Sequence, residues 1–319
     1  MPSEALKSVL DRDLSKAAAA SLIAVASPLL QELVNHATNA LVRCAQSTAG
    51  GIDEDAAALA HYRHLIEATD GIEILVTNCA PAAGVPLIRS AFEGLLGLEF
   101  VCEDEVTYAR RSLSWLVSHI HERLTFYDRL DPETPAGAKF ATVFAEDKVA
   151  STMPLPAPEF VRTLRQNLAG MLSKPHLQSI EAEYQAKGNR PGRRRRPKWY
   201  SLFDGPANLH DLALHLKRGA QYDLLYRHWS KSAHAEDFGA LVAGDKALKR
   251  LRDPADLKQV ASLAASFMLA GTRLMIDKFR RGENLEPWYV REVRDRYLLL
   301  SQRDQGANRS KEPPHPFGN

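Results

Sequence analysis

Cysteine is scarce in this sequence, and its cysteines form no recognisable pattern. Only Cys44, Cys79 and Cys102 occur in 319 residues, and they are widely spaced and odd in number. Disulfide frameworks and zinc sites both require cysteines paired at short spacings. This scarcity argues against either kind of cross-link and predicts a protein of the reducing cytoplasm.

A strong net charge and a long hydrophobic run are also absent. The formal charge is +2, which gives the chain no overall preference for nucleic acids or membranes. The apolar stretch "AAAASLIAVASPLL", residues 17–30, is shorter than the ~20 residues of a membrane span. The residues before it carry mixed charge, whereas a signal peptide begins with a basic region. We expect a buried helix that continues to about Cys44, and no membrane association.

Familiar catalytic and cofactor motifs are missing too. The sequence has no glycine-rich phosphate loop, no Gly-x-Ser-x-Gly elbow and no His-Glu-x-x-His motif. His61, His64 and Glu67 recur at three-residue intervals, but a metal site would need further ligands from another helix. His119 and His121 are two residues apart, so they would point in different directions on a helix. We expect no metal, no cofactor and histidines that lie on the surface.

Helical periodicity is the dominant feature that is present. Apolar residues recur at three- and four-residue intervals, whereas no alternating strand pattern of useful length and no internal repeat appear. The sequence therefore predicts an all-α fold, a helical bundle. Helices are expected over residues 17–44, 53–80, 84–104, 107–130, 159–172, 176–187, 206–234 with a break near Gly219, 253–281 and 285–302.

Composition also suggests how the chain is organised. Residues 1–52 form an N-terminal helical extension, and residues 53–302 form the bundle. An insertion at about 131–205 interrupts the bundle and carries a basic loop at 187–200. Residues 303–319 are polar and proline-rich, which predicts a disordered tail.

The basic loop carries four consecutive arginines between two prolines. They are Arg193, Arg194, Arg195 and Arg196, and Lys198, Trp199 and Tyr200 follow them. One interpretation is a nucleic-acid site, in which the cations bind phosphates and the two aromatic rings stack on bases. The other is a solvated loop, because short arginine runs are common on protein surfaces.

The segment "PLIRSAFEGLLGLEF" is apolar nearly all round, which predicts a buried helix. Arg89 and Glu93 nevertheless lie one turn apart on it, close to Ser90. Burying a charge is costly unless the charge is paired, so these residues indicate a polar interior or a cleft. An internal salt bridge between them is the simpler alternative. Gly94 and Gly97 favour close packing against another helix.

A second group of polar residues lies in "YRHWSKSAH", residues 226–234. In a continuous α-helix Asp223, Arg227, Ser230 and His234 share one stripe, with Arg227 and His234 about two turns or ~10 Å apart. "SKSAHAED" is rich in residues that end helices, so a stop near Ser232 would let His234 fold back towards Arg227. The two could then share one phosphate, with the guanidinium holding its oxygens and the imidazole moving a proton.

The pair Arg227-His228-x5-His234 resembles the Arg-x(4–6)-His motif of the HEPN superfamily. Proteins of that superfamily are all-α bundles, and many are metal-independent ribonucleases of toxin–antitoxin, abortive-infection and other antiviral systems. The chain is also similar to uncharacterised bacterial helical proteins that combine an Arg-x3-Glu helix with a Tyr-Arg-x2-Ser-x3-His segment. The resemblance covers about 53–130 and 206–281, and the matching residues are Arg89, Glu93, Tyr226, Arg227, Ser230 and His234.

The resemblance implies RNA cleavage through attack of the 2′-hydroxyl on the adjacent phosphorus. His234 would act as acid and base, Arg227 would stabilise the phosphorane charge, and Ser230 would orient them. Supporting roles fall to Arg89, Glu93, Asp223, Tyr226 and His228. A homodimer in which two motifs meet and a neutralising protein partner are further implications.

The alternative is a protein without catalysis. Arg89, Glu93, Arg227 and His234 would then form a buried hydrogen-bond network in a helical protein that binds nucleic acid or another protein. An antitoxin or sensor subunit is a third interpretation. A solvent-accessible cleft at Arg227 and His234 would favour the enzyme over both.

Overall fold

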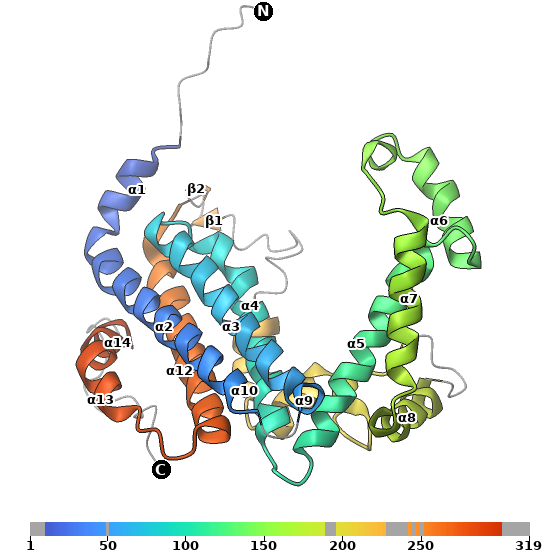
Figure 1. Cartoon of the computed structure of the whole chain (residues 1–319). Coiled ribbons are helices and arrows are strands. Elements are labelled where there is room, and N and C mark those ends of the chain that lie inside the picture. Colours follow the sequence, from blue (N-terminus) through green and yellow to red (C-terminus); the bar gives the residue numbers. More distant parts are fainter. Residues whose placement is uncertain are drawn as a thin grey trace, which may run out of the picture. The chain divides into compact units, whose positions relative to one another are not determined.

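The computed structural model describes residues 10–48, 51–188, 196–227, 242–243, 247–248 and 252–301 (Figure 1). The prediction of an all-α fold is confirmed, because helices make up nearly all of the described chain. The exception is a hairpin of two-residue strands, β1 (Val242–Ala243) and β2 (Ala247–Leu248), which pair antiparallel. The chain divides into two compact units: unit 1 takes 1–50, 58–103 and 209–319, and unit 2 takes 51–57 and 104–208.

Unit 1 is built from long helices and several short helical turns. The long helices are α2 (Ala20–Gln46), α3 (Ile52–Thr77, which begins in unit 2), α4 (Pro81–Cys102) and α12 (Leu257–Phe279). The shorter ones are α1 (Arg12–Ala18), α9 (Leu209–His215), α10 (Gly219–Gln221), η4 (Tyr222–Arg227), η6 (Pro254–Asp256), α13 (Glu286–Trp288), η7 (Tyr289–Val293) and α14 (Arg294–Ser301).

The core of unit 1 forms where α12 packs against both α2 and α4. Phe92 of α4 and Phe267 of α12 are buried with their ring centroids 5.6 Å apart. Tyr62 of α3 is also buried, and its hydroxyl lies 2.9 Å from Thr272 Oγ1 of α12. Burial raises the pKa of the Tyr62 phenol, so this hydroxyl serves as a neutral hydrogen-bonding group.

The predicted N-terminal helix is present, but it is part of the core. Leu29, Leu30 and Leu33 of α2 are buried, and α2 belongs to unit 1 together with the helices it contacts. The opposite face of its first turns is exposed to solvent. The apolar stretch 17–30 is therefore buried on one face only. Residues 1–52 therefore do not form a separate appendage in the described part of the chain.

A buried carboxylate ties α2 to α3. Glu73 is 8% exposed, and its Oε1 accepts hydrogen bonds from Ser27 (2.6 Å), Gln31 (2.9 Å) and Thr77 (2.7 Å). Burial alone would raise the pKa of Glu73, but these three donors outweigh it and lower the pKa. The carboxylate therefore stays charged in the native protein at neutral pH.

One helix is long and apolar enough to cross a membrane by length and composition. It runs through η6 and α12, Pro254–Phe279, and 61% of its most apolar window is buried inside the protein. The pair α1 and α2 meets the same criterion if it is taken as one span bent by 84°. Core helices also meet this criterion, and α12 occupies the centre of the unit 1 core.

Close approach of three helices depends on glycine. A Cβ on Gly97 of α4 would lie 2.5 Å from a ring atom of His61 on α3. A Cβ on Gly94 would lie 3.0 Å from His64, and one on Gly271 of α12 would lie 2.7 Å from Leu65. The predicted role of Gly94 and Gly97 in helix packing is confirmed.

The break expected near Gly219 is present, but another residue makes it. Lys217 adopts φ +59°, and Arg218 N donates to Ala213 O, which closes α9 with a left-handed cap. The helix η4 that follows α10 is a π-helix, so the α-helical spacing assumed for residues 223–234 does not hold within it.

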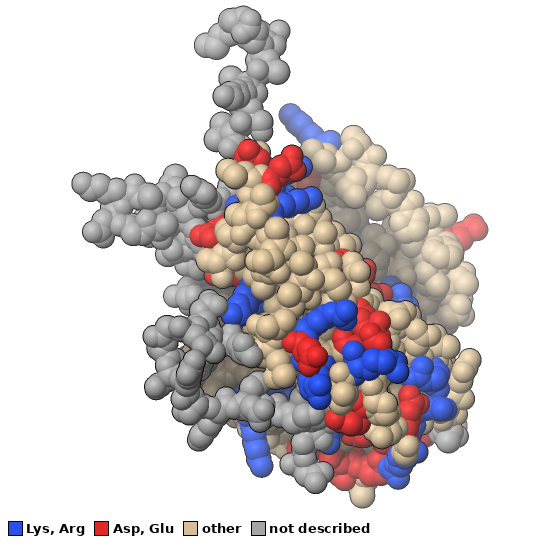
Figure 2. Space-filling view, turned by 90° about the vertical axis from the view of Figure 1, so that its left-hand side faces the viewer, with Lys and Arg blue, Asp and Glu red and all other residues tan. Residues whose placement is uncertain are grey.

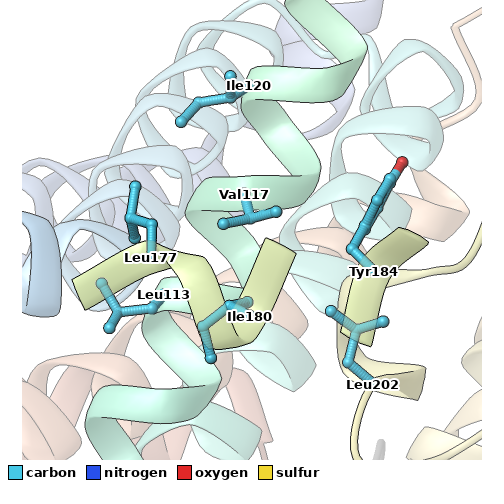
Figure 3. Close-up of a cluster of buried hydrophobic side chains, with 7 residues drawn as sticks. All are labelled: Leu113, Val117, Ile120, Leu177, Ile180, Tyr184 and Leu202. Carbon is cyan, nitrogen blue, oxygen red and sulfur yellow. The ribbon is translucent and has the colours of Figure 1, made fainter. Parts of the chain in front are cut away.

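Unit 2 is a smaller group of helices around α5. Its elements are α5 (Tyr108–Leu130), α6 (Pro135–Glu146), η1 (Ala150–Thr152), α7 (Pro158–Leu172), η2 (Pro175–Leu177), α8 (Gln178–Gly188) and η3 (Trp199–Ser201). Figure 3 shows its core, in which residues of α5 face residues of η2, of α8 and of the chain just after η3; the cluster comprises Leu113, Val117, Ile120, Leu177, Ile180, Tyr184 and Leu202.

The predicted insertion, about 131–205, falls within unit 2, but that unit begins earlier and includes all of α5. Helix α6 was not predicted, because no helix was expected between residues 130 and 159. Thr134 Oγ1 accepts from Gly137 N at 2.9 Å, and Pro135 occupies the first turn. The short segment that follows α5 therefore also contains the residues that begin α6. The predicted tail, 303–319, lies outside the described residues.

We expect Gly97→Ala to lower the free energy of unfolding by about 1–3 kcal/mol, since the new methyl group would overlap a ring held inside the α3–α4 interface. Urea unfolding measures the change. Gly170→Ala in α7 is the matched control, because a Cβ there meets nothing within 4 Å, and it should stabilise by about 0.5–1 kcal/mol. Equal effects of both variants would contradict the proposed close packing.

Candidate functional site

Arg89 and Glu93 form an ion pair on α4. Arg89 Nε lies 3.4 Å from Glu93 Oε1, and the two side chains are 21% and 43% exposed. The rest of α4 is largely buried, so this pair marks the edge of the helix that reaches solvent. The two residues therefore form a partly exposed polar site, and not a sealed internal network.

Two histidines of α3 lie against the same part of α4. His64 Nε2 is 2.8 Å from Ser90 Oγ, and the ring of His61 fills the space beside Gly97. The expectation of surface histidines is wrong for His61, whose Nε2 is buried. Burial, and to a lesser extent the nearby His64, lowers the pKa of His61 to about 4. Ser90, Gly94 and Gly97 are small residues on one face, and that spacing indicated a close neighbour without identifying the rings.

The segment that carries the predicted motif begins beside α4. Helix η4, Tyr222–Arg227, contacts α4, and Asp223 in its first turn is exposed. For Tyr226 and Arg227 the structure describes only the backbone, and His228, Ser230 and His234 lie outside the described residues. The structure thus places η4, which ends at Arg227, in contact with the helix that carries Arg89 and Glu93.

A pocket of about 530 Å³ lies at the carboxyl end of α4, where η4 starts. Its wall contains two contacts between acidic residues at the end of α4 and basic residues between His215 and Arg218. Arg218 donates from Nε and Nη2 to both carboxylate oxygens of Glu99, and His215 Nε2 is 2.8 Å from Glu103 Oε2. Lys217 and Gln221 complete the polar lining. Two carboxylates at the carboxyl end of α4 are thus hydrogen-bonded by side chains that come shortly before η4.

The chain returns to the other end of α4 after the predicted motif. Arg252 Nη1 donates to the carbonyl oxygen of Asn78, just before α4 begins, and η6 contacts α4. Gly84 in the first turns of α4 lies against Val260 of α12. The described residues before and after the motif therefore flank opposite ends of α4.

The predicted nucleic-acid segment belongs to unit 2. Arg193, Arg194 and Arg195 lie outside the described residues, whereas Arg196 and Lys198 are exposed. Arg196 Nη1 donates to the carbonyl oxygen of His121 at 2.7 Å, which attaches this end of the run to α5. Trp199 is partly buried and Tyr200 is 8% exposed, so the expectation that Tyr200 is available for stacking is wrong.

The histidine pair of α5 points in two directions, as predicted. His119 stacks on Trp115 with ring centroids 5.1 Å apart, and His121 stacks on Tyr184 at 4.3 Å. His121 Nε2 also lies 2.7 Å from Glu181 Oε2. Among the described residues no group of three or more His, Cys, Asp or Glu side chains could hold a metal ion.

Charge on the molecular surface is mixed where it can be seen. Figure 2 shows one face, on which Lys and Arg side chains are interspersed with Asp and Glu. Ion pairs such as Arg43–Glu283 and Arg291–Glu292, both 2.7 Å, are typical of this pattern. The described residues on that face form no broad positive surface for a nucleic acid.

Comparison with protein families finds one match, which covers residues 55–243 and is described as a family of unknown function, DUF5677. The match extends over more than half of the chain. The chain belongs to the DUF5677 family. No curated protein and no solved structure matches the chain. The DUF5677 stretch includes α4, η4 and unit 2 from Asp55 onwards, so it contains every candidate site residue, whereas α2 and α12 lie outside it.

We expect the stability of this DUF5677 protein to fall as the pH drops from 6.5 to about 4. The native state favours neutral His61, so it binds fewer protons than the unfolded state in this window. The loss should be on the order of 2–3 kcal/mol. His36, whose pKa burial also lowers, adds in the same direction.

Urea unfolding at several pH values tests this expectation. His61→Gln should flatten the dependence, because the titrating group is gone, whatever its effect at neutral pH. His119→Gln, at an exposed histidine of α5, is the control and should leave the slope unchanged. An unchanged slope in His61→Gln would show that the ring is not held neutral by its site.

Proposed function

We propose that this chain is a metal-independent endoribonuclease, with its active centre between η4 and α4 in unit 1. The observation that supports the proposal best is the contact of η4, which ends at Arg227, with the helix that carries Arg89 and Glu93. The resemblance to HEPN-type ribonucleases implies this pairing of an Arg-His segment with an Arg-x3-Glu helix. The setting it implies is a bacterial defence or toxin-type system in the cytoplasm, with a neutralising protein partner.

The contacts at the two ends of α4 support an antiparallel course of the motif segment along this helix. Arg218 contacts Glu99 at the carboxyl end, and the chain reappears at the amino end of α4 through Arg252. Such a course leads from Glu99 towards the Arg89–Glu93 pair, so we propose that Arg227 comes near that pair.

The proposed chemistry needs only side chains. A base removes the proton of the RNA 2′-hydroxyl, the oxygen attacks the adjacent phosphorus, and an acid protonates the departing 5′-oxygen. His234 is proposed to carry the proton transfers, Arg227 to stabilise the charge of the phosphorane, and Ser230 to orient them. Arg89, held by Glu93, adds a second cation beside the phosphate. Asp223, Tyr226 and His228 are proposed to hold the segment that carries Arg227 and His234 in place.

The helix type of η4 is in keeping with a functional role. π-helical turns are rare and occur frequently at functional sites, because their wider turn displaces side chains from α-helical positions. Unit 1 has a second π-helix, η7, which does not belong to the proposed site. The π-helical form of η4 therefore supports the proposal only in combination with the contact between η4 and α4.

RNA binding is assigned to the basic segment of unit 2. Arg196 and Lys198 are exposed cations, and Trp199 is partly exposed. We propose that these two cations and Arg193, Arg194 and Arg195 bind phosphates without reading sequence, and that Trp199 stacks on a base.

A second candidate function is RNA binding without cleavage. The observation that favours it is the Arg89–Glu93 ion pair, since each partner neutralises the charge that catalysis would use. The two candidates share the same RNA-binding surface and differ in turnover, so one assay separates them.

We expect the purified protein to cleave single-stranded RNA in the presence of EDTA and to leave 2′,3′-cyclic phosphate or 3′-phosphate ends. His234→Ala should lower the rate by about 10²–10⁴-fold, which is the usual contribution of a positioned acid–base group. Arg227→Lys should lower it by about 10²-fold or more, because an ammonium does not reproduce the two-point contact of a guanidinium. End-labelled RNA and mass analysis of the termini provide the measurement.

Matched controls are available on the surface. His176→Ala and Arg63→Lys alter an exposed histidine and an exposed arginine outside the site, and both should keep full activity. Cleavage that requires Mg²⁺ and leaves 3′-hydroxyl ends, or full activity of His234→Ala, would refute the mechanism. Tight RNA binding without cleavage across many RNAs would favour the second candidate.

We expect the triple change of Arg193, Arg194 and Arg195 to serine to weaken RNA binding and its dependence on salt. Each lost phosphate contact lowers the log–log salt slope by about 0.7 on single strands, so the slope should fall by up to about 2. Arg196 is left intact, because its bond to His121 O contributes to unit 2. A serine triple at the exposed, ion-paired Arg63, Arg291 and Arg294 is the control. Equal slopes for the two triples would identify the run as a solvated loop.

A further inference from the structure

Apolar side chains gather on the surface of unit 2 around α6 and the chain that follows it. Of fifteen large hydrophobic residues that the described chain exposes, five lie between 143 and 160, and every residue from 151 to 160 is exposed. Isolated exposed hydrophobic residues are normal, whereas a cluster indicates a contact with another molecule. The five are Val143, Val149, Met153, Leu155 and Phe160, between 48% and 76% exposed.

Helix α6 is formed but largely uncovered. Its Thr134 cap and Pro135 define its start, and it contacts α5 and η1, yet only Gly137 among its residues is buried. Phe140 and Phe144 lie together on the side towards Gly137, with ring centroids 5.5 Å apart. Val143 lies about a quarter-turn away from them and is 57% exposed. One side of α6 is therefore free of contacts from the described chain.

The free side carries one basic and one acidic residue. Lys139 and Glu146 are exposed, and they lie seven residues apart and so on one face of α6, on either side of Val143. They are about two turns apart, which is too far for an ion pair between them. Neither forms an ion pair within the described residues, whereas the neighbouring Asp147 accepts from Val149 N and Ala150 N, both at 2.9 Å.

We propose that this surface is a homodimer interface in which α6 pairs antiparallel with α6 of a second copy. A twofold axis beside Val143 brings Lys139 of each copy opposite Glu146 of the other, so two identical ion pairs flank an apolar centre. This charge complementarity is the reason for choosing a second copy. The inference does not depend on the proposed ribonuclease activity.

The chemistry of the surface makes other occupants less suitable. Residues 135–160 contain two lysines and three acidic residues, so an anionic membrane or a nucleic acid would find no excess of positive charge. If each large side chain has a surface of ~150–200 Å², the exposed parts of the five apolar residues add up to on the order of 500 Å² per copy. A standard interface buries ~800 Å² per partner, so alanines, prolines and the charged rim would contribute the rest, and the dimer should be weak.

Charge reversal gives a test that distinguishes this interface from any other. Wild-type protein should dimerise with rising concentration in sedimentation equilibrium. Lys139→Glu and Glu146→Lys should each weaken the dimer at least tenfold, because each places like charges opposite one another twice. The two variants mixed should form a heterodimer, and Lys139→Glu/Glu146→Lys in one chain should restore the homodimer. Lys16→Glu on α1 is the control and should behave as wild type.

Each other outcome overturns the proposal. A wild-type chain that stays monomeric at the highest attainable concentration rules the interface out. Single variants that dimerise as tightly as wild type show that another surface is used. Wild-type protein that remains monomeric but floats with neutral phosphatidylcholine vesicles would assign the apolar surface to a membrane. Because both substituted positions are exposed, circular dichroism should show unchanged folding in every variant.

Discussion

The close approach of α3, α4 and α12 is the constraint on which unit 1 depends. Gly97 leaves room for the ring of His61, and Gly271 leaves room for Leu65, so the three backbones come nearer than ordinary side chains allow. The tight packing has an electrostatic consequence, because it buries the Nε2 atom of the partly exposed His61 and lowers the pKa of the ring, which favours its neutral form. It also sets His64 against Ser90, next to Arg89. The packing constraint and the polar site are thus two results of one helix interface.

The DUF5677 match covers only part of the helices that form the core of unit 1. Helix α4 is apolar nearly all round, so it needs neighbours on several sides. Within the DUF5677 stretch α3, α9 and η4 supply some of them, but α12 also packs against α4 and lies outside that stretch. Residues 55–243 therefore contain the candidate site without the whole core that holds it. The hydrogen bonds of Glu73 extend this dependence to α2, which also lies outside.

The sequence was sufficient for much of the fold, because helices follow from periodicity. The long helices and the burial of α4 were predicted within a few residues of their bounds. Helix α6 was missed because the short segment that follows α5 also contains the residues that begin α6. The π-turn η4 was missed because no composition rule separates it from an α-helix. The burial of His61 and Tyr200 depends on partners from distant segments, which a periodic pattern does not reveal.

Within the proposed function, the charges of α4 suggest how its two groups of polar residues cooperate. At the carboxyl end Glu99 and Glu103 are matched by Arg218 and His215 from the segment before η4. Glu93 is the remaining acidic residue on that side of α4, and Arg89 is its present partner. In the proposed site Arg227 joins Arg89 beside this one carboxylate. Two guanidinium groups and one carboxylate leave a net positive charge, which a bound phosphate would neutralise.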